Sequence, residues 1–176
     1  MTDLRIHKQA NSPVYAPFSW RAALAASISG GLVFTLLHIG LLRALHGVSP
    51  WVPVRMIAAM VLGPAVLSPP DTFDVVVVLA AILLHGMLSI VYGVLLAFLL
   101  PAVNTIWCIV VGGLYGLTLY YINFYGFNAF SPWFMEERDA LSMVSHFAFG
   151  AVVAWVYKVV HSRWYGGKSE PAPANG

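Results

Sequence analysis

The sequence predicts an all-α membrane protein with four transmembrane helices and one shorter re-entrant or interfacial helix. Its 176 residues are 60% hydrophobic and only 9% charged, whereas soluble domains are roughly a quarter charged. The mean hydropathy is +0.80. Four apolar segments are long enough to cross a hydrocarbon core of about 30 Å at a rise of about 1.5 Å per residue. With a shorter fifth one, the apolar segments cover residues 21–46, 51–68, 75–100, 102–124 and 139–161.

Polar flanks bound this helical membrane domain, which we place at residues 21–161. Residues 1–20 form an N-terminal arm, and residues 162–176 form a tail rich in Pro, Gly and Ala. The first apolar run is longer than the 7–15 residues of a signal-peptide core, so we expect it to remain as a span. The composition of the tail predicts disorder.

The segment at residues 51–68 differs from the other four. Arg55 lies near its start, and an arginine at the centre of a bilayer costs at least about 2.5–3.5 kcal/mol. Gly63-Pro64 interrupts the segment, and Pro69-Pro70 ends it. These residues predict a re-entrant or interfacial helix, and a full span is the alternative.

The charges near both ends of the chain predict that both termini are cytoplasmic. Cytoplasmic flanks carry an excess of Lys and Arg, so basic residues at both ends require an even number of spans. Four spans with a re-entrant segment at 51–68 satisfy this requirement. The basic residues are Arg5, Lys8 and Arg21 in the N-terminal flank, and Lys158, Arg163 and Lys168 in the C-terminal one.

Three histidines, His38, His85 and His146, lie inside three different predicted spans. In this topology each is roughly 10–15 Å below the outer boundary of the bilayer. Small residues recur at four-residue spacing beside each of them, which is typical of helix-packing faces in membranes. We therefore expect all three imidazoles to point into the bundle. Ionisable residues inside spans are rare and indicate a functional site.

Three inward imidazoles are open to several interpretations. Each can form a hydrogen bond across a helix interface, as buried polar groups must. They can instead bind a cofactor, either haem held axially or a Cu or Zn ion, or they can relay protons. His38, His85 and His146 are accordingly candidate haem or metal ligands, although no HxxxH or HExxH motif is present.

Acidic residues gather on the predicted outer side. Carboxylates before the last span favour the N-terminal end of its helix through the helix dipole. The alternative is an acidic vestibule that collects cations together with Asp71 and Asp74. Arg55 needs a partner at its depth, and we expect a structural ion pair with Asp71 and Asp74. The carboxylates before the last span are Glu136, Glu137 and Asp139.

Short motifs in the second half of the chain carry a family resemblance: His85 with Tyr92, Gly112 with Gly116, Pro132-Trp133-Phe134 with Glu136, and Ser145-His146 followed by Trp155. Residues 85–163 resemble the YagU-like family of small bacterial inner-membrane proteins. The resemblance implies a bacterial inner-membrane location and a four-span plan, and it brings no catalytic residues. It also implies that His85 and His146 belong to a shared pattern.

The predicted function is non-catalytic. The sequence pairs no nucleophile with a neighbouring base, and its net charge of +2 does not indicate nucleic acid. The single cysteine, Cys108, allows no internal disulfide. We expect a structural or accessory subunit of a larger membrane complex, such as an electron-transfer assembly, or a homo-oligomer with Gly112 and Gly116 at the contact. The alternatives are a haem- or metal-binding protein built on the three histidines, and a small ion or proton transporter.

Overall fold

Helices joined by short loops make up the computed structural model, which describes residues 18–100, 104–127 and 129–166 and has no β-strand among them. The predicted four-span helical architecture is confirmed. The last helix continues to Gly166, so the predicted disorder of residues 162–166 is wrong, and that of residues 167–176 lies outside the described chain. The helices long and apolar enough to cross a membrane are Trp20–His46, Val75–Leu99, Ile106–Gly126 and Ala140–Trp164.

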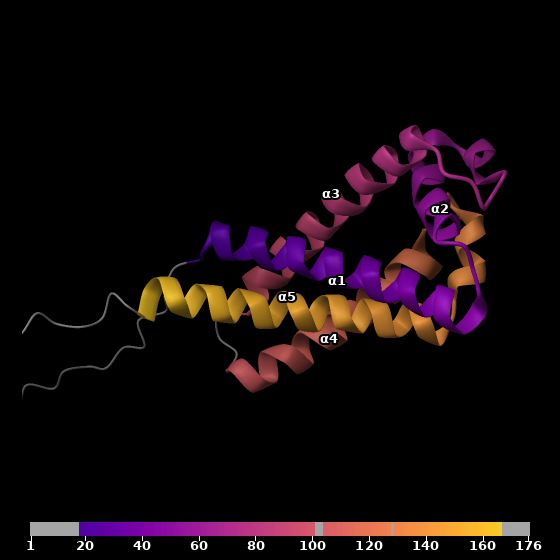
Figure 1. Ribbon diagram of the computed structural model, residues 1–176. Coiled ribbons are helices and arrows are strands. Elements are labelled where there is room, and N and C mark those ends of the chain that lie inside the picture. The colour runs from indigo at the N-terminus through magenta and orange to yellow at the C-terminus, as the bar shows by residue number, and fades with distance from the viewer. Residues whose placement is uncertain (1–17, 101–103, 128, 167–176) are drawn as a thin grey trace, which may run out of the picture.

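The first and last spans, α1 (Trp20–His46) and α5 (Ala140–Gly166), lie side by side and run in opposite directions (Figure 1). The guanidinium of Arg21 lies 5.3 Å from the ring centre of Trp164, so the start of α1 and the end of α5 share one end of the bundle. α4 (Thr105–Tyr121) also packs against α5. α3 (Val75–Leu99) crosses α1 and diverges from it toward its own N-terminal end (Figure 1).

Polar side chains determine where the spans begin. The side chain of Ser19 accepts a hydrogen bond from the backbone N–H of Ala22 at the start of α1. Asp74 accepts from two backbone N–H groups at the start of α3, and Asn104 accepts from one in α4. Asp139 does the same for α5, at 2.8 Å. Because the first N–H groups of a helix have no partner inside it, these four side chains stabilise the helix ends.

Glycines allow α4 and α5 to approach closely. A Cβ atom on Gly112 would meet the carbonyl oxygen of Gly150, and one on Gly116 would meet the carbonyl oxygen of His146. The glycine-bearing faces of α4 and α5 therefore pack against each other within a single chain. The predicted homo-oligomer contact through Gly112 and Gly116 is wrong, because α5 already covers that face.

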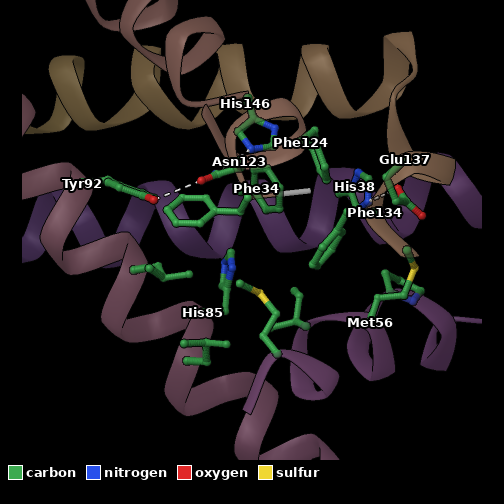
Figure 2. Close-up of a pocket in the computed structure, with 16 residues that line it drawn as sticks. Phe34, His38, Met56, His85, Tyr92, Asn123, Phe124, Phe134, Glu137 and His146 are labelled. Carbon is green, nitrogen blue, oxygen red and sulfur yellow. Dashed lines mark hydrogen bonds and ion pairs between the residues drawn. The ribbon is translucent and has the colours of Figure 1, made fainter. Parts of the chain in front are cut away.

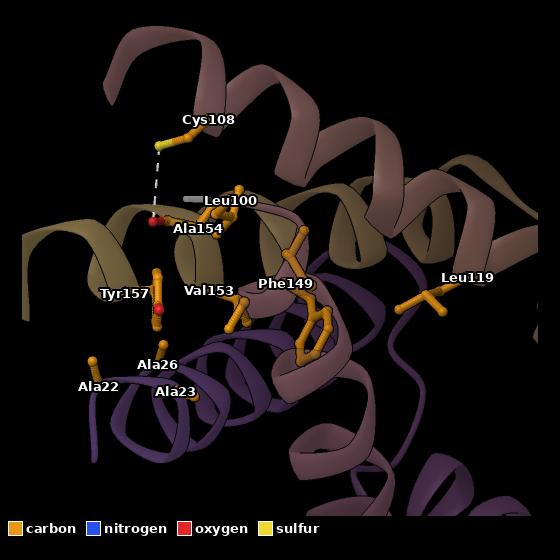
Figure 3. Close-up of a cluster of buried hydrophobic side chains, with 12 residues drawn as sticks. Ala22, Ala23, Ala26, Leu100, Cys108, Leu119, Phe149, Val153, Ala154 and Tyr157 are labelled. Atoms are coloured by element: carbon orange, nitrogen blue, oxygen red, sulfur yellow. Dashed lines mark hydrogen bonds between the residues drawn. The ribbon is translucent and has the colours of Figure 1, made fainter. Parts of the chain in front are cut away.

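The buried apolar core lies at the end of the bundle where α1 starts and α5 ends. Its alanines come mainly from α1, and its larger side chains come from the other three spans (Figure 3). Small side chains in α1 let the neighbouring helices pack closely, as is typical in membranes. The cluster comprises Ala22, Ala23, Ala26, Leu96, Ala97, Leu100, Cys108, Leu119, Phe149, Val153, Ala154 and Tyr157.

The short helix α2 (Trp51–Leu62) lies at the opposite end of the bundle. Its 12 residues cover about 18 Å, too little to cross the membrane. Gly63 follows with a φ of +86°, which favours glycine, and leads into the turn η1 (Pro64–Leu67). α2 packs along α3 and fills the space left where α3 diverges from α1 (Figure 1).

The outer faces of the spans carry large apolar side chains. Leu36 in α1 and Leu83 in α3 are each 72% exposed, and Leu24, Ile28 and Leu32 continue the α1 stripe at four-residue spacing. Contiguous apolar surface of this extent would be unfavourable in water. It is the surface expected to face lipid.

Candidate functional site

Phe34 brings the three predicted histidines into one site. Its ring centre lies 5.5 Å from that of His38, 5.3 Å from that of His85 and 4.8 Å from that of His146. The imidazoles come from α1, α3 and α5 and approach the phenyl ring from different sides (Figure 2). His38 and His146 are buried and His85 is half-buried. The phenyl ring thus occupies the space between them.

His85 ties α3 to α1. Its Nε2 atom lies 3.2 Å from the carbonyl oxygen of Gly31 and 3.0 Å from Oγ1 of Thr35. A carbonyl oxygen only accepts, and the Thr35 hydroxyl donates its own hydrogen to Gly31, so Nε2 of His85 carries the proton. In the neutral ring Nδ1 is then an acceptor. The Nδ1 atom of His85 has no hydrogen-bond partner among the described residues, and part of its surface is accessible.

His146 ends a chain of hydrogen bonds between three spans. Its Nδ1 donates to the carbonyl oxygen of Ser142 at 2.8 Å, which leaves Nε2 as the acceptor of a neutral ring. The amide nitrogen of Asn123 lies 3.4 Å from that Nε2, and the Asn123 oxygen accepts from the hydroxyl of Tyr92 at 3.0 Å (Figure 2). Every donor in this chain faces an acceptor, so the four residues satisfy one another.

His38 faces a buried carboxylate. Its Nε2 atom lies 3.1 Å from Oε2 of Glu137, which also accepts from the hydroxyl of Ser142 at 3.3 Å. Its Nδ1 atom lies 3.5 Å from the hydroxyl oxygen of Ser145, whose hydrogen is donated to the carbonyl of Leu141. Both ring nitrogens therefore face acceptors. An imidazolium satisfies both of them at once and balances the charge of the carboxylate.

The helical turn η3 (Pro132–Glu137) brings Glu137 into the bundle. The indole N–H of Trp133 donates to the carbonyl of Met56 at 2.9 Å and so anchors η3 on α2. Glu137 is 8% exposed, while its neighbour Glu136 is exposed. Of the three carboxylates predicted to stabilise the start of the last span, Asp139 caps it directly, whereas Glu137 instead pairs with His38.

A π-helical turn at the end of α4 directs two more side chains into the site. This turn, η2 (Ile122–Gly126), places both Asn123 and Phe124 beside the histidines. The guanidinium of Arg138 donates twice to the carbonyl of Phe124, at 2.8 and 3.0 Å, and lies over the ring of Tyr125. Wide turns of this kind are common at functional sites because they reorient side chains within a helix.

A cavity of about 220 Å³ opens beside these groups, between α1, α2, α3 and the η2–η3 region (Figure 2). Its walls are mostly apolar, and its polar groups come from the histidines, Tyr92, Asn123 and Glu137. Two smaller cavities of about 100 and 70 Å³ adjoin it, and Phe34 and His85 border all three. The most exposed lining residues are Met60 and Phe127, at 38% and 42%, so we infer that the mouth of the cavity lies beside them.

The arrangement does not fit a metal ion or a haem between the histidines. Among the described residues, no three His, Cys, Asp or Glu side chains converge on a common point. The Phe34 ring lies between the three imidazoles and fills the space that a shared ion or a haem would need. The interpretation in which each histidine makes hydrogen bonds across a helix interface describes the geometry better.

Arg55 lies away from this site and is buried, and no carboxylate of the described residues pairs with it. Its guanidinium donates to the carbonyl of Val66 at 2.6 Å, and to the carbonyl and hydroxyl of Thr72 at 2.8–3.1 Å. The predicted ion pair with Asp71 and Asp74 is wrong. Asp74 caps α3 and Asp71 is exposed, so loop carbonyls hold the guanidinium instead.

The sequence prediction did not identify Asn123 or Thr35 as members of the site. Each is a polar residue inside an otherwise apolar span, and that is the signal that marks them, since such residues need a partner in the bundle. No protein-family model matches this sequence, and no characterised protein or solved structure is significantly similar to it.

Proposed function

We propose that this chain is a non-catalytic integral membrane protein that binds a small lipophilic molecule in the cavity beside His85. The observation that carries the proposal is the cavity itself, which combines apolar walls with a few polar groups converging from several helices. Binding sites for small molecules typically have this composition.

The size of the cavity limits the size of the ligand. A cavity of about 150 Å³ holds a benzene molecule, and sites for drug-sized ligands start at about 300 Å³. At about 220 Å³, the cavity suits a molecule of one or two rings or a short branched chain. Met56 and Met60 line it, and flexible thioether side chains adapt to the shape of a ligand.

The mouth of the cavity supports entry from the membrane. Met60 and Phe127 flank it, and both are apolar and exposed. A lipophilic molecule concentrates in the bilayer, so it reaches such a mouth without crossing water. We propose that both termini are cytoplasmic, because the basic residues Arg21, Lys158 and Arg163 lie toward one end of the bundle. A bacterial inner-membrane location is what the resemblance to the YagU-like family implies.

The test is recovery of the ligand from native membranes. The protein is purified in mild detergent, extracted with organic solvent and analysed by mass spectrometry. Leu88→Trp fills the cavity from α3, and Leu83→Trp adds the same side chain on the exposed face of α3. We expect one small molecule to accompany the wild type and Leu83→Trp and to be absent from Leu88→Trp. Equal recovery from all three proteins would contradict the proposal.

An accessory role in a larger membrane complex remains a prediction and is compatible with ligand binding. The same mild-detergent preparation tests it through the proteins that co-purify with a C-terminally tagged chain. Recovery of one known complex in stoichiometric amount would support the accessory role, and recovery of the tagged chain alone would contradict it.

A further inference from the structure

We infer that the ligand is a neutral hydroxylated aromatic molecule whose hydroxyl group donates a hydrogen bond to Nδ1 of His85. This inference rests on the proposed function, because it names the chemical class that the same cavity selects. It follows from three properties of the cavity: the unused acceptor at His85, the balanced charge at the far wall, and the aromatic side chains around it.

The first property is the unused acceptor. Nε2 of His85 is held by Gly31 and Thr35, which fixes the ring and leaves Nδ1 as the acceptor of the neutral form. His146 uses both of its ring nitrogens within the bundle. His85 borders the main cavity and both smaller ones, so a ligand in any of them lies beside it. An acceptor in an apolar site favours a ligand that donates a hydrogen bond.

The second property is the balance of charge. Glu137 is the one carboxylate among the residues that line the main cavity, and its Oε2 atom is 3.1 Å from Nε2 of His38. With His38 as its counter-ion, this wall has no net charge for a ligand to neutralise. A charged ligand would have to be desolvated without compensation, which is costly inside a bilayer. A neutral ligand avoids this cost.

The third property is the aromatic lining. Four phenylalanines line the cavity, and the ring centre of Phe34 lies only 5.3 Å from that of His85. Aromatic pairs prefer offset-stacked or edge-to-face packing at 4.5–7 Å, so a flat ring bound at His85 finds aromatic partners within reach. The lining phenylalanines are Phe34, Phe124, Phe127 and Phe134.

The experiment compares two probes of similar shape in lipid nanodiscs. 1-Naphthol carries a hydroxyl donor, and 1-methylnaphthalene has a methyl group in its place. Saturation binding is measured for each probe, with the free concentration expressed per volume of lipid. Nanodiscs with Leu88→Trp give the background from partitioning, and Leu83→Trp is the matched control. We expect the wild type to bind 1-naphthol about fivefold more tightly than 1-methylnaphthalene, as one neutral hydrogen bond provides.

A variant at His85 then tests the acceptor. In His85→Phe the ring shape is kept and both nitrogens are removed, so no acceptor remains at the Nδ1 position. The carbonyl of Gly31 still accepts from the hydroxyl of Thr35. We expect the affinity for 1-naphthol to fall about fivefold and that for 1-methylnaphthalene to stay unchanged. Should this variant not fold, ¹⁵N NMR of histidine-labelled wild type replaces it. The His85 Nδ1 signal should then shift with 1-naphthol and not with 1-methylnaphthalene.

The outcomes separate the inference from the proposed function. Equal binding of both probes by the wild type, abolished in Leu88→Trp, would overturn the inference and leave the proposed function supported. A preference for 1-naphthol that persists in His85→Phe, or an unchanged Nδ1 signal, would overturn the role of His85. Binding of neither probe above the Leu88→Trp background would overturn both the inference and the proposed function.

Discussion

Nε2 of His38 lies 3.1 Å from Oε2 of Glu137, so a histidine of the first span is paired with a carboxylate from the turn before the last span. Both side chains are largely buried, and the hydroxyls of Ser142 and Ser145 complete their surroundings. A pair of this kind costs free energy to desolvate, and loss of either partner leaves the other without compensation. The pair therefore ties η3 and α5 to α1 at the rim of the cavity.

Replacing Glu137 with Gln should destabilise the protein, because it leaves His38 without a counter-ion. Loss of one partner of a buried pair costs about 3 kcal/mol. Unfolding can be followed with a thiol-reactive dye, since Cys108 is the single cysteine and is buried. Glu136→Gln is the matched control, and its effect should stay within about 0.5 kcal/mol because Glu136 is exposed. Equal unfolding temperatures for the two variants would contradict the ion pair.

Gly116→Ala should destabilise the α4–α5 contact rather than change the oligomeric state. The added methyl group meets the carbonyl oxygen of His146, which belongs to the backbone and cannot rotate away. Overpacking of this kind typically costs about 1–3 kcal/mol. Gly40→Ala is the control, because a Cβ there has no atom within 4 Å. A Gly116→Ala protein of normal stability that elutes as a smaller assembly would instead place this face between chains.

Arg55→Lys should loosen the loop that follows α2, whereas Asp71→Asn should leave it unchanged. The guanidinium uses three nitrogens to hold Val66 and Thr72, and an ammonium group cannot reproduce that geometry. The loss should be about 2 kcal/mol, as for hydrogen bonds to a charged group. Limited proteolysis between residues 63 and 74 measures the effect. If Asp71→Asn increased cleavage as much as Arg55→Lys, a role for the carboxylate would be restored.

Much of the fold could be predicted because its determinants are periodic. Apolar length, together with Arg55 and the Gly63-Pro64 break, separates the four spans from α2. Residues such as Ser89, Gly93 and Ala97 mark a buried face by their spacing. The same spacing predicts that His146 faces into the bundle, and the structure buries it. These features follow from the regular spacing of residues along a helix, which can be read directly from the sequence.

The partners of the polar residues could not be predicted because irregular backbone selects them. Glu136 and Glu137 look equivalent in sequence, and only the path of η3 buries one and exposes the other. Arg55 has carboxylates close in sequence, but its guanidinium is bound by carbonyl oxygens of the loop. Carbonyl oxygens carry no formal charge, so a count of charged residues does not predict this contact. Asn123 enters the site because α4 ends in a π-helical turn, for which the sequence offers no periodic signal.

Zinc or haem should not stabilise this protein. A metal at His85 or His146 would lack further ligands, because no three His, Cys, Asp or Glu side chains of the described residues converge on one point. It would also have to displace the ring of Phe34, which lies between the imidazoles. The unfolding temperature with and without excess Zn²⁺ or haem should be equal in His46→Asn, which removes an exposed histidine as an adventitious ligand. Metal content after dialysis gives a second measurement. Stoichiometric metal that is retained by the wild type and lost in His146→Ala would contradict the hydrogen-bonding role, because it would show that Nε2 of His146 binds an ion and not the amide of Asn123.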